Sequence, residues 1–312
     1  MHAQVIGRWS EQVEPGRPLF VVGPTGVGKT EFAHELAERC GARLLSMDSM
    51  QVYRGLDRGT AKPSPEERAR FGYGGIDLVD WRASFSAAQY RDHAQAFLEA
   101  CERRGHPVVV VGGTGLYYRS LVRGLCAAPP GDPALRRELE RLSVSELAER
   151  LAAVDPEAFA DVDRRNPRRL IRAIEVKEAS GISIREWQAR TTRPVLRRFR
   201  TLWLERPAGA LRKRIAARVG SMLASGWIEE VADRLREAGP DVLFRCPAIG
   251  YARIARFLVH GGSRERLAEE IAADTYRYAK KQLTWFRKES SVRYWLMLEE
   301  HAPLPWCSRS AE

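Results

Sequence analysis

A glycine-rich segment of eight residues constrains this chain more than any other feature. Residues 23–30 read GPTGVGKT, directly after the apolar run RPLFVV at 17–22 and directly before a helical pattern. The pattern G-x-x-x-x-G-K-[ST] between a strand and a helix predicts a loop whose backbone N–H groups surround phosphate oxygens. Within this loop, Lys29 offers a cation to the outer phosphate oxygens and Thr30 offers a hydroxyl ligand to Mg²⁺. The loop predicts phosphate binding, but not what is done with the phosphates.

Short apolar runs and helical patterns alternate along the first part of the chain. The runs at 17–22, 42–48 and 107–113 are typical of buried strands, and helical spacing covers 86–104. This alternation predicts an α/β fold in which helices wind around a parallel sheet. With the phosphate loop, it predicts a sheet of the P-loop NTPase type.

A second domain is predicted where the pattern changes. From 131 the sequence is nearly all helical and rich in Arg and Glu, and strand character returns at 198–205. We therefore expect a P-loop core made of 18–130 and 198–312, which includes the C-terminal helices. An inserted helical domain is expected at 131–197.

The positive charge is concentrated in one segment. The chain has a formal net charge of +11, and residues 161–220 hold 17 Lys and Arg against 6 Asp and Glu. The rest of the chain is therefore balanced. A local basic block predicts a surface for a polyanion such as a nucleic acid, the alternative being an arginine-rich solvated surface.

Composition excludes several other classes of protein. The five cysteines are scattered and form no C-x-x-C pair, which argues against a disulfide framework and a thiolate zinc site. No apolar run is long enough to span a membrane, and the first residues do not read as a secretory signal. We expect a cytoplasmic monomer with no membrane partner.

The acids at the strand ends bear on the chemistry. A kinase or NTPase usually has an acid at the end of an apolar strand to hold Mg²⁺. The strand at 107–113 ends in glycine followed by Thr114, without an acid, whereas the strand at 42–48 ends in Asp48. This weakens a plain NTPase interpretation and leaves it open.

Longer motifs resemble the bacterial tRNA dimethylallyltransferases, the tRNA isopentenyltransferase family. They are GPTGVGKT, DSMQVYRGLDRGTAKP, GGTGLYYRS, NPRRLIRAIEV, AIGY and YAKKQLTWFRK, in the family's order over about residues 18–289. The resemblance implies transfer of a dimethylallyl group from dimethylallyl diphosphate to N6 of adenine 37 in the anticodon stem-loop of tRNA, with release of diphosphate and with Mg²⁺ as cofactor. One departure is that Gly74 and Gly75 stand where the family usually has histidine.

The implied reaction gives the phosphate loop and two polar residues specific roles. The loop would hold the leaving diphosphate, and Asp48 would orient the adenine amine and accept its proton. The alternative for Asp48 is a helix cap or a Mg²⁺ contact. Thr114 would touch the diphosphate or the attacked amine, and Asp57 is expected to be structural. The residues assigned to the diphosphate are Gly23, Pro24, Thr25, Gly26, Val27, Gly28, Lys29, Thr30 and Arg218, with Thr30 also the metal ligand.

Arg214 and Arg218 share a helix face, where they are expected either to close over the diphosphate or to form salt bridges.

The resemblance also implies contacts with tRNA from both predicted domains. For Trp285 and Phe286, packing in the core is the alternative. The implied set is Asp48, Ser49, Met50, Gln51, Thr114, Arg136, Arg168, Arg169, Leu170, Ile171, Arg172, Pro247, Ala248, Ile249, Gly250, Tyr251, Ala252, Lys280, Lys281, Gln282, Leu283, Thr284, Trp285, Phe286 and Arg287. Gln51 is expected to pair with a purine edge, which requires the target base to leave its stack.

Two other functions remain as alternatives. A nucleotide or small-molecule kinase would use the same phosphate loop, with Asp48 as its base. A non-catalytic RNA-binding switch would hold a nucleotide and would not need Asp48.

Overall fold

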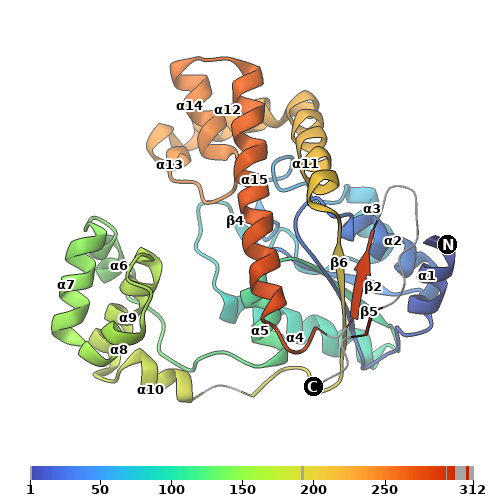
Figure 1. Cartoon of the computed structure of the whole chain (residues 1–312), viewed down its shortest axis with the longest axis horizontal. Coiled ribbons are helices and arrows are strands. Elements are labelled where there is room, and N and C mark those ends of the chain that lie inside the picture. Colours follow the sequence, from blue (N-terminus) through green and yellow to red (C-terminus); the bar gives the residue numbers. More distant parts are fainter. Residues whose placement is uncertain (1, 191–192, 293, 299–306, 309–312) are drawn as a thin grey trace. The chain divides into compact units, whose positions relative to one another are not determined.

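The computed structural model describes residues 2–190, 193–292, 294–298 and 307–308. The chain divides into two compact units: Met1–Tyr118 with Leu196–Glu312 forms unit 1, and Arg119–Val195 forms unit 2. Figure 1 follows the chain through both. No helix among the described residues is long and apolar enough to cross a membrane.

Unit 1 contains a six-stranded sheet with the order β2-β5-β1-β6-β7-β8. The strands β2, β5, β1, β6 and β7 run parallel, and β8 pairs antiparallel with β7. Their bounds are β1 Leu19–Val22, β2 Arg43–Met47, β5 Val108–Gly112, β6 Arg200–Glu205, β7 Tyr294–Met297 and β8 Cys307–Ser308. A separate parallel pair consists of β3 (Tyr53–Arg54) and β4 (Val79–Asp80).

Complete burial explains why the central strands are continuous apolar runs. Every residue of β1 and β5 is buried, as expected for a parallel sheet covered by helices on both faces. The predicted strands at 17–22, 42–48, 107–113 and 198–205 are all present. The sequence did not reveal β7, a four-residue strand with only half-buried side chains.

The helices of unit 1 lie before and between the strands along the chain. The helix α2 buries Phe32, Ala33 and Leu36 and ends at Gly41, which is left-handed with φ 65°. The others are α1 His2–Ser10, α3 Pro65–Phe71, α4 Ala87–Arg103, α11 Ala208–Met222, α12 Ile228–Ala238, α13 Pro240–Phe244, α14 Tyr251–His260 and α15 Arg264–Arg287, with α2 spanning Lys29–Cys40 and a π-helical turn η1 at Leu223–Trp227. Helix α5, Gly115–Val122, contains the division between the units.

Unit 2 is helical throughout its described elements and has its own core. Its helices are α6 Pro133–Leu139, α7 Val144–Val154, α8 Pro156–Asp161, α9 Pro167–Ser180 and α10 Ile184–Ala189. Leu139, Leu147, Leu151 and Ile174 pack together in this core. The P-loop-like parallel sheet with an inserted all-helical domain is therefore confirmed.

Unit 2 begins earlier than the predicted inserted domain at 131–197. The segment before 131 is bonded to unit 2: Arg172 Nη2 donates to the carbonyl oxygens of Ala128 and Pro129, the latter at 2.8 Å, and Ala127 N–H donates to Arg190 O. These contacts explain why the segment belongs with the helices that follow it.

Candidate phosphate and acceptor site

Three predicted site segments meet at one edge of the sheet. The phosphate loop follows β1, Asp48 follows β2, and Thr114 follows β5 by two residues. Because β2, β5 and β1 are parallel neighbours, their carboxyl ends adjoin at the edge where ligands bind in open α/β sheets. The fold thus brings together residues that lie far apart in sequence.

The phosphate loop has a backbone that only glycine adopts without strain. Gly26 has φ 81° and Gly28 has φ 109°, and α2 begins directly afterwards at Lys29. The first turn of a helix leaves its N–H groups unbonded within the helix and carries partial positive charge. The loop therefore has the glycine-dependent turn before a helix that the sequence predicted, and its binding of phosphate stays a prediction.

Cationic side chains fix the carbonyl groups of this loop. Lys29 Nζ donates to Pro24 O at 2.9 Å, Arg206 Nε to Val27 O at 2.8 Å, and Arg214 Nε to Gly26 O at 3.2 Å. Arg214 also lies 3.5 Å from Glu31. Of the two alternatives for Arg214, the structure shows bonding to protein groups, and its bond to Gly26 O stiffens the loop.

Gln282 connects the loop to the β5 turn. Its Oε1 accepts from Thr25 N–H at 2.8 Å, and its Nε2 donates to Gly113 O at 3.0 Å. The residue is buried, so both ends of its amide are used inside unit 1. In this structure Gln282 therefore acts as a clamp between the loop and the β5 turn, and the Thr25 N–H is bonded to it. The predicted contacts of Gln282 with RNA and of Thr25 with the diphosphate stay predictions.

The Lys29 ammonium is buried near the guanidinium of Arg218 and the carboxylate of Asp48. Burial, followed by the nearby guanidinium of Arg218, lowers the pKa of Lys29 to about 8, although the charge of Asp48 acts in the opposite direction. Burial likewise lowers the pKa of Arg218, although its side chain remains in contact with solvent. Two cations that repel each other form a favourable site for an anion that neutralises both.

Asp48 combines a fixed oxygen with a second, available oxygen. Its Oδ1 accepts Met50 N–H at 2.8 Å, which orients the carboxylate. Its Oδ2 has no hydrogen-bond partner among the described residues. Thr114 is oriented similarly, because its Oγ1 accepts Ser49 N–H at 3.0 Å. Both side chains are half-buried, as suits groups that act on a bound substrate.

Three tyrosines near Asp48 were not identified from the sequence. Tyr278 lies near the side chains of Thr114 and Gln282, and burial, followed by the charge of Asp48, raises its pKa. Tyr90 and Tyr117 stack with ring centroids 3.9 Å apart, and Tyr90 donates to Ser46 O. Tyr278 lies one helical turn before Gln282, a spacing that the sequence does contain.

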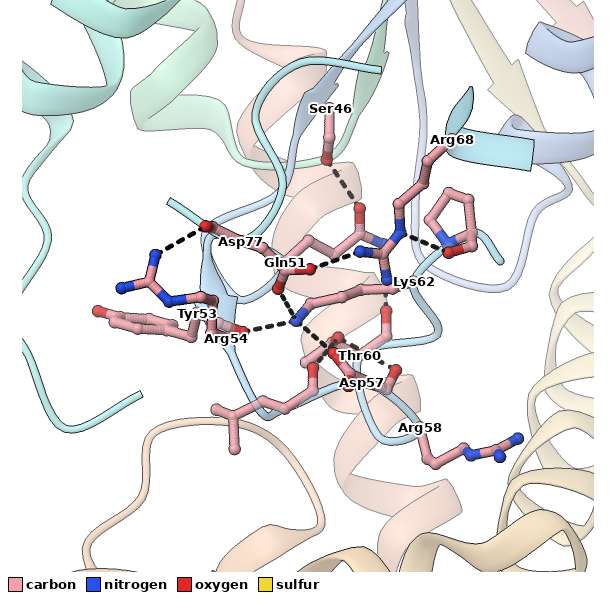
Figure 2. Close-up of polar contacts among 12 residues, drawn as sticks. Ser46, Gln51, Tyr53, Arg54, Asp57, Arg58, Thr60, Lys62, Arg68 and Asp77 are labelled. Carbon is pink, nitrogen blue, oxygen red and sulfur yellow. Dashed lines mark hydrogen bonds and ion pairs between the residues drawn. The ribbon is translucent and has the colours of Figure 1, made fainter. Parts of the chain in front are cut away.

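The segment after Asp48 is held by a network around Lys62 (Figure 2). The Lys62 side chain is only 1 % exposed, and its Nζ lies 2.6 Å from Asp57 Oδ1 and 2.5 Å from Asp77 Oδ1. Lys62 Nζ also donates to Tyr53 O, and Arg68 pairs with the other oxygen of Asp77. Asp57 is thus a structural acid, as expected.

The Gln51 amide is used inside the same network. Its Oε1 accepts from the Ser46 hydroxyl at 2.8 Å, and its Nε2 donates to the carbonyl oxygens of Thr60 and Ala61. Ala61 and Asp77 are the non-glycine residues with positive φ in the described chain, at 48° and 55°. The Gln51 amide thus stabilises this strained loop, and its expected pairing with a purine stays a prediction.

The two glycines that depart from the family pattern have specific neighbours. A Cβ at Gly74 would lie 2.5 Å from the Phe97 ring, so this space is already filled. Gly75 N–H donates to His93 Nε2 at 3.1 Å. A histidine from α4 thus contacts the backbone here.

The residues predicted to bind tRNA divide into exposed and buried groups. Arg168 and Arg169 are exposed on α9, as are Lys280, Lys281, Thr284 and Arg287 on α15, while Arg287 also pairs with Glu205 at 3.0 Å. Arg136 is half exposed and bonds to both oxygens of buried Glu175 at 2.7 Å. Pro247 is exposed, and Ser49, Met50, Arg172, Ile249, Ala252, Leu283 and Trp285 are half-buried.

For the buried residues of this set, the side chains pack inside the protein and do not face RNA in this structure. Leu170 and Ile171 belong to the core of unit 2, and Phe286 packs against Trp203 and Tyr118. The hydroxyl of buried Tyr251 donates to Glu230 Oε1 at 2.5 Å. Ala248 and Gly250 are also buried. Apolar residues that stand next to basic residues in a motif, such as Leu170 and Ile171, hold the helix in place by packing in the core.

The donor atoms at the site are compatible with Mg²⁺. No group of three or more His, Cys, Asp or Glu able to hold a metal occurs among the described residues. Mg²⁺ does not require such a cage, because it keeps several waters and takes one or two protein oxygens together with substrate phosphates. The Thr30 hydroxyl and the Asp48 carboxylate, beside the phosphate loop, supply oxygens of that kind.

Comparisons with known proteins agree with this arrangement. The sequence model of the family described as IPP transferase matches residues 51–289, and that described as isopentenyl transferase matches 18–71. The tRNA dimethylallyltransferase of Methylacidiphilum infernorum is 50% identical over 282 residues, 89% of this chain and 85% of that protein. That of Syntrophobacter fumaroxidans is 42% identical over 289 residues, 91% of this chain and 84% of that protein.

Solved structures show the same fold. A full-length tRNA isopentenylpyrophosphate transferase from Bacillus halodurans has a TM-score of 0.63 at 32% identity and covers 90% of both chains. A eukaryotic dimethylallyltransferase acting on tRNA has a TM-score of 0.75 at 23% identity, over 90% of this chain and 74% of that chain, a likeness of fold alone. With a family match over most of its length, this chain belongs to the IPP transferase family.

Proposed function

We propose that this chain is a tRNA dimethylallyltransferase. It transfers a dimethylallyl group from dimethylallyl diphosphate to N6 of adenine 37 in the anticodon stem-loop of tRNA and releases diphosphate. The observation that carries this proposal is the joint placement of Lys29, Arg218 and Asp48, which puts an anion site and a carboxylate at one sheet edge. The enzyme would act as a monomer in the cytoplasm.

The phosphate loop binds the leaving group. The diphosphate gains negative charge as the bond between C1 of the dimethylallyl group and the diphosphate oxygen breaks. Oriented hydrogen-bond donors stabilise that charge most strongly in a site from which water is excluded. Lys29, Arg218 and the first turn of α2 supply the donors. Mg²⁺ held by Thr30 would add Lewis-acid stabilisation of the departing diphosphate.

Asp48 prepares the nucleophile. The adenine amine is a weak nucleophile because its lone pair is delocalised into the ring. Asp48 accepts a hydrogen bond from the amine at Oδ2 while Oδ1 stays bonded to Met50, and it takes the amine proton as the N6–C1 bond forms. The Thr114 hydroxyl, fixed by Ser49, donates its hydrogen toward the diphosphate.

RNA binding draws on exposed cations of both units. Arg168 and Arg169 on α9, with Lys280 and Lys281 on α15, are exposed and supply charge for phosphates.

The test uses the purified chain, an unmodified anticodon stem-loop, and either dimethylallyl diphosphate or labelled ATP. Mass spectrometry should show RNA heavier by one dimethylallyl group only with the prenyl donor, and no label should pass from ATP. Phosphate transfer from ATP without prenylation of the RNA would support the kinase alternative and overturn the proposal.

A further inference from the structure

One carboxylate in unit 1 joins two segments that are distant in sequence. Glu230 of α12 accepts through Oε2 from the backbone N–H groups of Asp57, at 3.0 Å, and Arg58, at 2.8 Å. Its Oε1 accepts from the Tyr251 hydroxyl at 2.5 Å. The loop at 55–61 is therefore tied to the turn at 247–252.

Packing around Trp227 fixes the separation of the same two segments. The indole is 1 % exposed and lies between Gly59 of the loop and Gly250 of the turn. A Cβ would lie 2.2 Å from the ring at Gly59 and 2.3 Å at Gly250. Neither segment can approach the ring more closely, so loop and turn behave as one surface.

The backbone of Arg58 is fixed within that surface at both of its polar atoms. Its N–H donates to Glu230, and its carbonyl oxygen accepts from Ala61 N–H at 3.0 Å. The preceding residue, Asp57, is held by Lys62. Little backbone freedom remains to be lost when the side chain binds a partner.

The Arg58 side chain, in contrast, is not used by the protein. It is exposed, and no hydrogen bond or ion pair to its guanidinium occurs among the described residues. In Figure 2 it points away from the network of dashed lines. An unpaired guanidinium on a fixed backbone is suited to a phosphate, which it can bind through two donors.

We propose that Arg58 is an RNA-phosphate contact and that Glu230 is the positioning residue that holds it beside the turn at 247–252. The inference rests on the proposed function, since it assigns the phosphate to the tRNA substrate. It differs from the implied contacts because neither Arg58 nor Glu230 is among them. Arg58 binds the RNA, and Glu230 acts only through Arg58 and the turn.

The experiment measures the affinity of the anticodon stem-loop by fluorescence anisotropy across a series of salt concentrations. Arg58→Ala should weaken binding roughly 5- to 10-fold at low salt and lower the slope of log affinity against log salt by about 0.7–1. Arg103→Ala is the matched control, because Arg103 is an exposed arginine at the end of α4, before β5 begins. The KM for dimethylallyl diphosphate should not change in either variant.

Glu230 is tested through its coupling to Arg58. Glu230→Ala should lose most of the affinity lost by Arg58→Ala, and the double variant should be little weaker than Arg58→Ala. Glu230→Gln, which retains an acceptor for the two N–H groups, should restore binding. Glu229→Ala is the control, since Glu229 is the exposed carboxylate next in the helix.

Each outcome decides the inference. Affinity and salt slope unchanged in Arg58→Ala would overturn the contact, and additive losses in the double variant would overturn the positioning role. If Glu230→Ala fails to fold, Glu230→Gln against Glu230→Asp replaces it, because the shorter Asp side chain moves the carboxylate away from the loop; equal affinity in both would also overturn positioning. If the wild type binds RNA through Arg58 but does not prenylate it, the proposed function fails while the contact stands.

Discussion

The arginines beside the phosphate loop of unit 1 and those on α9 of unit 2 belong to the same basic segment of the sequence, but they differ in what they contact. Arg206 and Arg214 bond to the carbonyl groups of the phosphate loop. Arg168 and Arg169 are exposed at the start of α9, whereas the next two residues, Leu170 and Ile171, pack in the core of unit 2. Net charge therefore locates a basic region, but only the structure separates cations that shape a site from cations that face a ligand.

If the edge of unit 1 performs the chemistry, removing Asp48 should have the largest effect. Asp48→Asn should lower kcat about 10²- to 10⁴-fold, because the amide cannot accept the amine proton, while RNA affinity changes less than about 3-fold. Single-turnover prenylation and anisotropy measure the two quantities. Equal losses in both would show that Asp48 mainly binds RNA.

Removing the Gln282 clamp should have the second largest effect on activity. Gln282→Ala leaves Thr25 N–H and Gly113 O without their partner, so kcat/KM for the prenyl donor should fall roughly 10- to 100-fold. Lys281→Ala, at the exposed neighbouring position, is the control and should change RNA affinity but not the KM for the donor. An unchanged kcat/KM for the donor in Gln282→Ala would contradict the clamp.

A pH titration tests the charge on Lys29. The pKa of Lys29 is lowered to about 8 by burial and Arg218, so the ammonium predominates below that pH. The diphosphate binds the ammonium form, and donor affinity should therefore fall above pH 8, by at most about tenfold per pH unit. Calorimetric titration between pH 6.5 and about 9.5 measures this, with Lys29→Arg as the control that keeps its charge. A fall of the same size in Lys29→Arg would assign the titration to another group.

The smallest effects are expected on α9. Arg168→Ala and Arg169→Ala should each weaken RNA binding about 2- to 5-fold and reduce the salt slope, without changing donor KM or thermal stability. Lys177→Ala, at the other end of the same helix, is the control. If RNA affinity stays constant, α9 is a solvated surface, the alternative that charge alone left open.

The parts predictable from sequence are those governed by local pattern. The phosphate loop, the strand ending at Asp48 and the buried face of α2 follow from glycine placement and apolar spacing. The Gln282 clamp joins residues 257 positions apart, and the Lys62 network depends on the folding of its loop. A place inside the motif predicts an RNA contact for Leu170 and Ile171, but their helical spacing is that of a buried face.

The central claim is that the phosphate loop holds the donor while Asp48 acts on the acceptor. Calorimetric titration of the wild type, Lys29→Ala and Asp48→Asn at pH 7, with a non-reactive thiolodiphosphate analogue of the donor and with ATP, tests it directly. We predict that the wild type binds the analogue at least about tenfold more tightly than ATP, that Lys29→Ala loses about tenfold or more, and that Asp48→Asn stays within about 3-fold. Tighter binding of ATP, or equal losses in the two variants, would contradict the account.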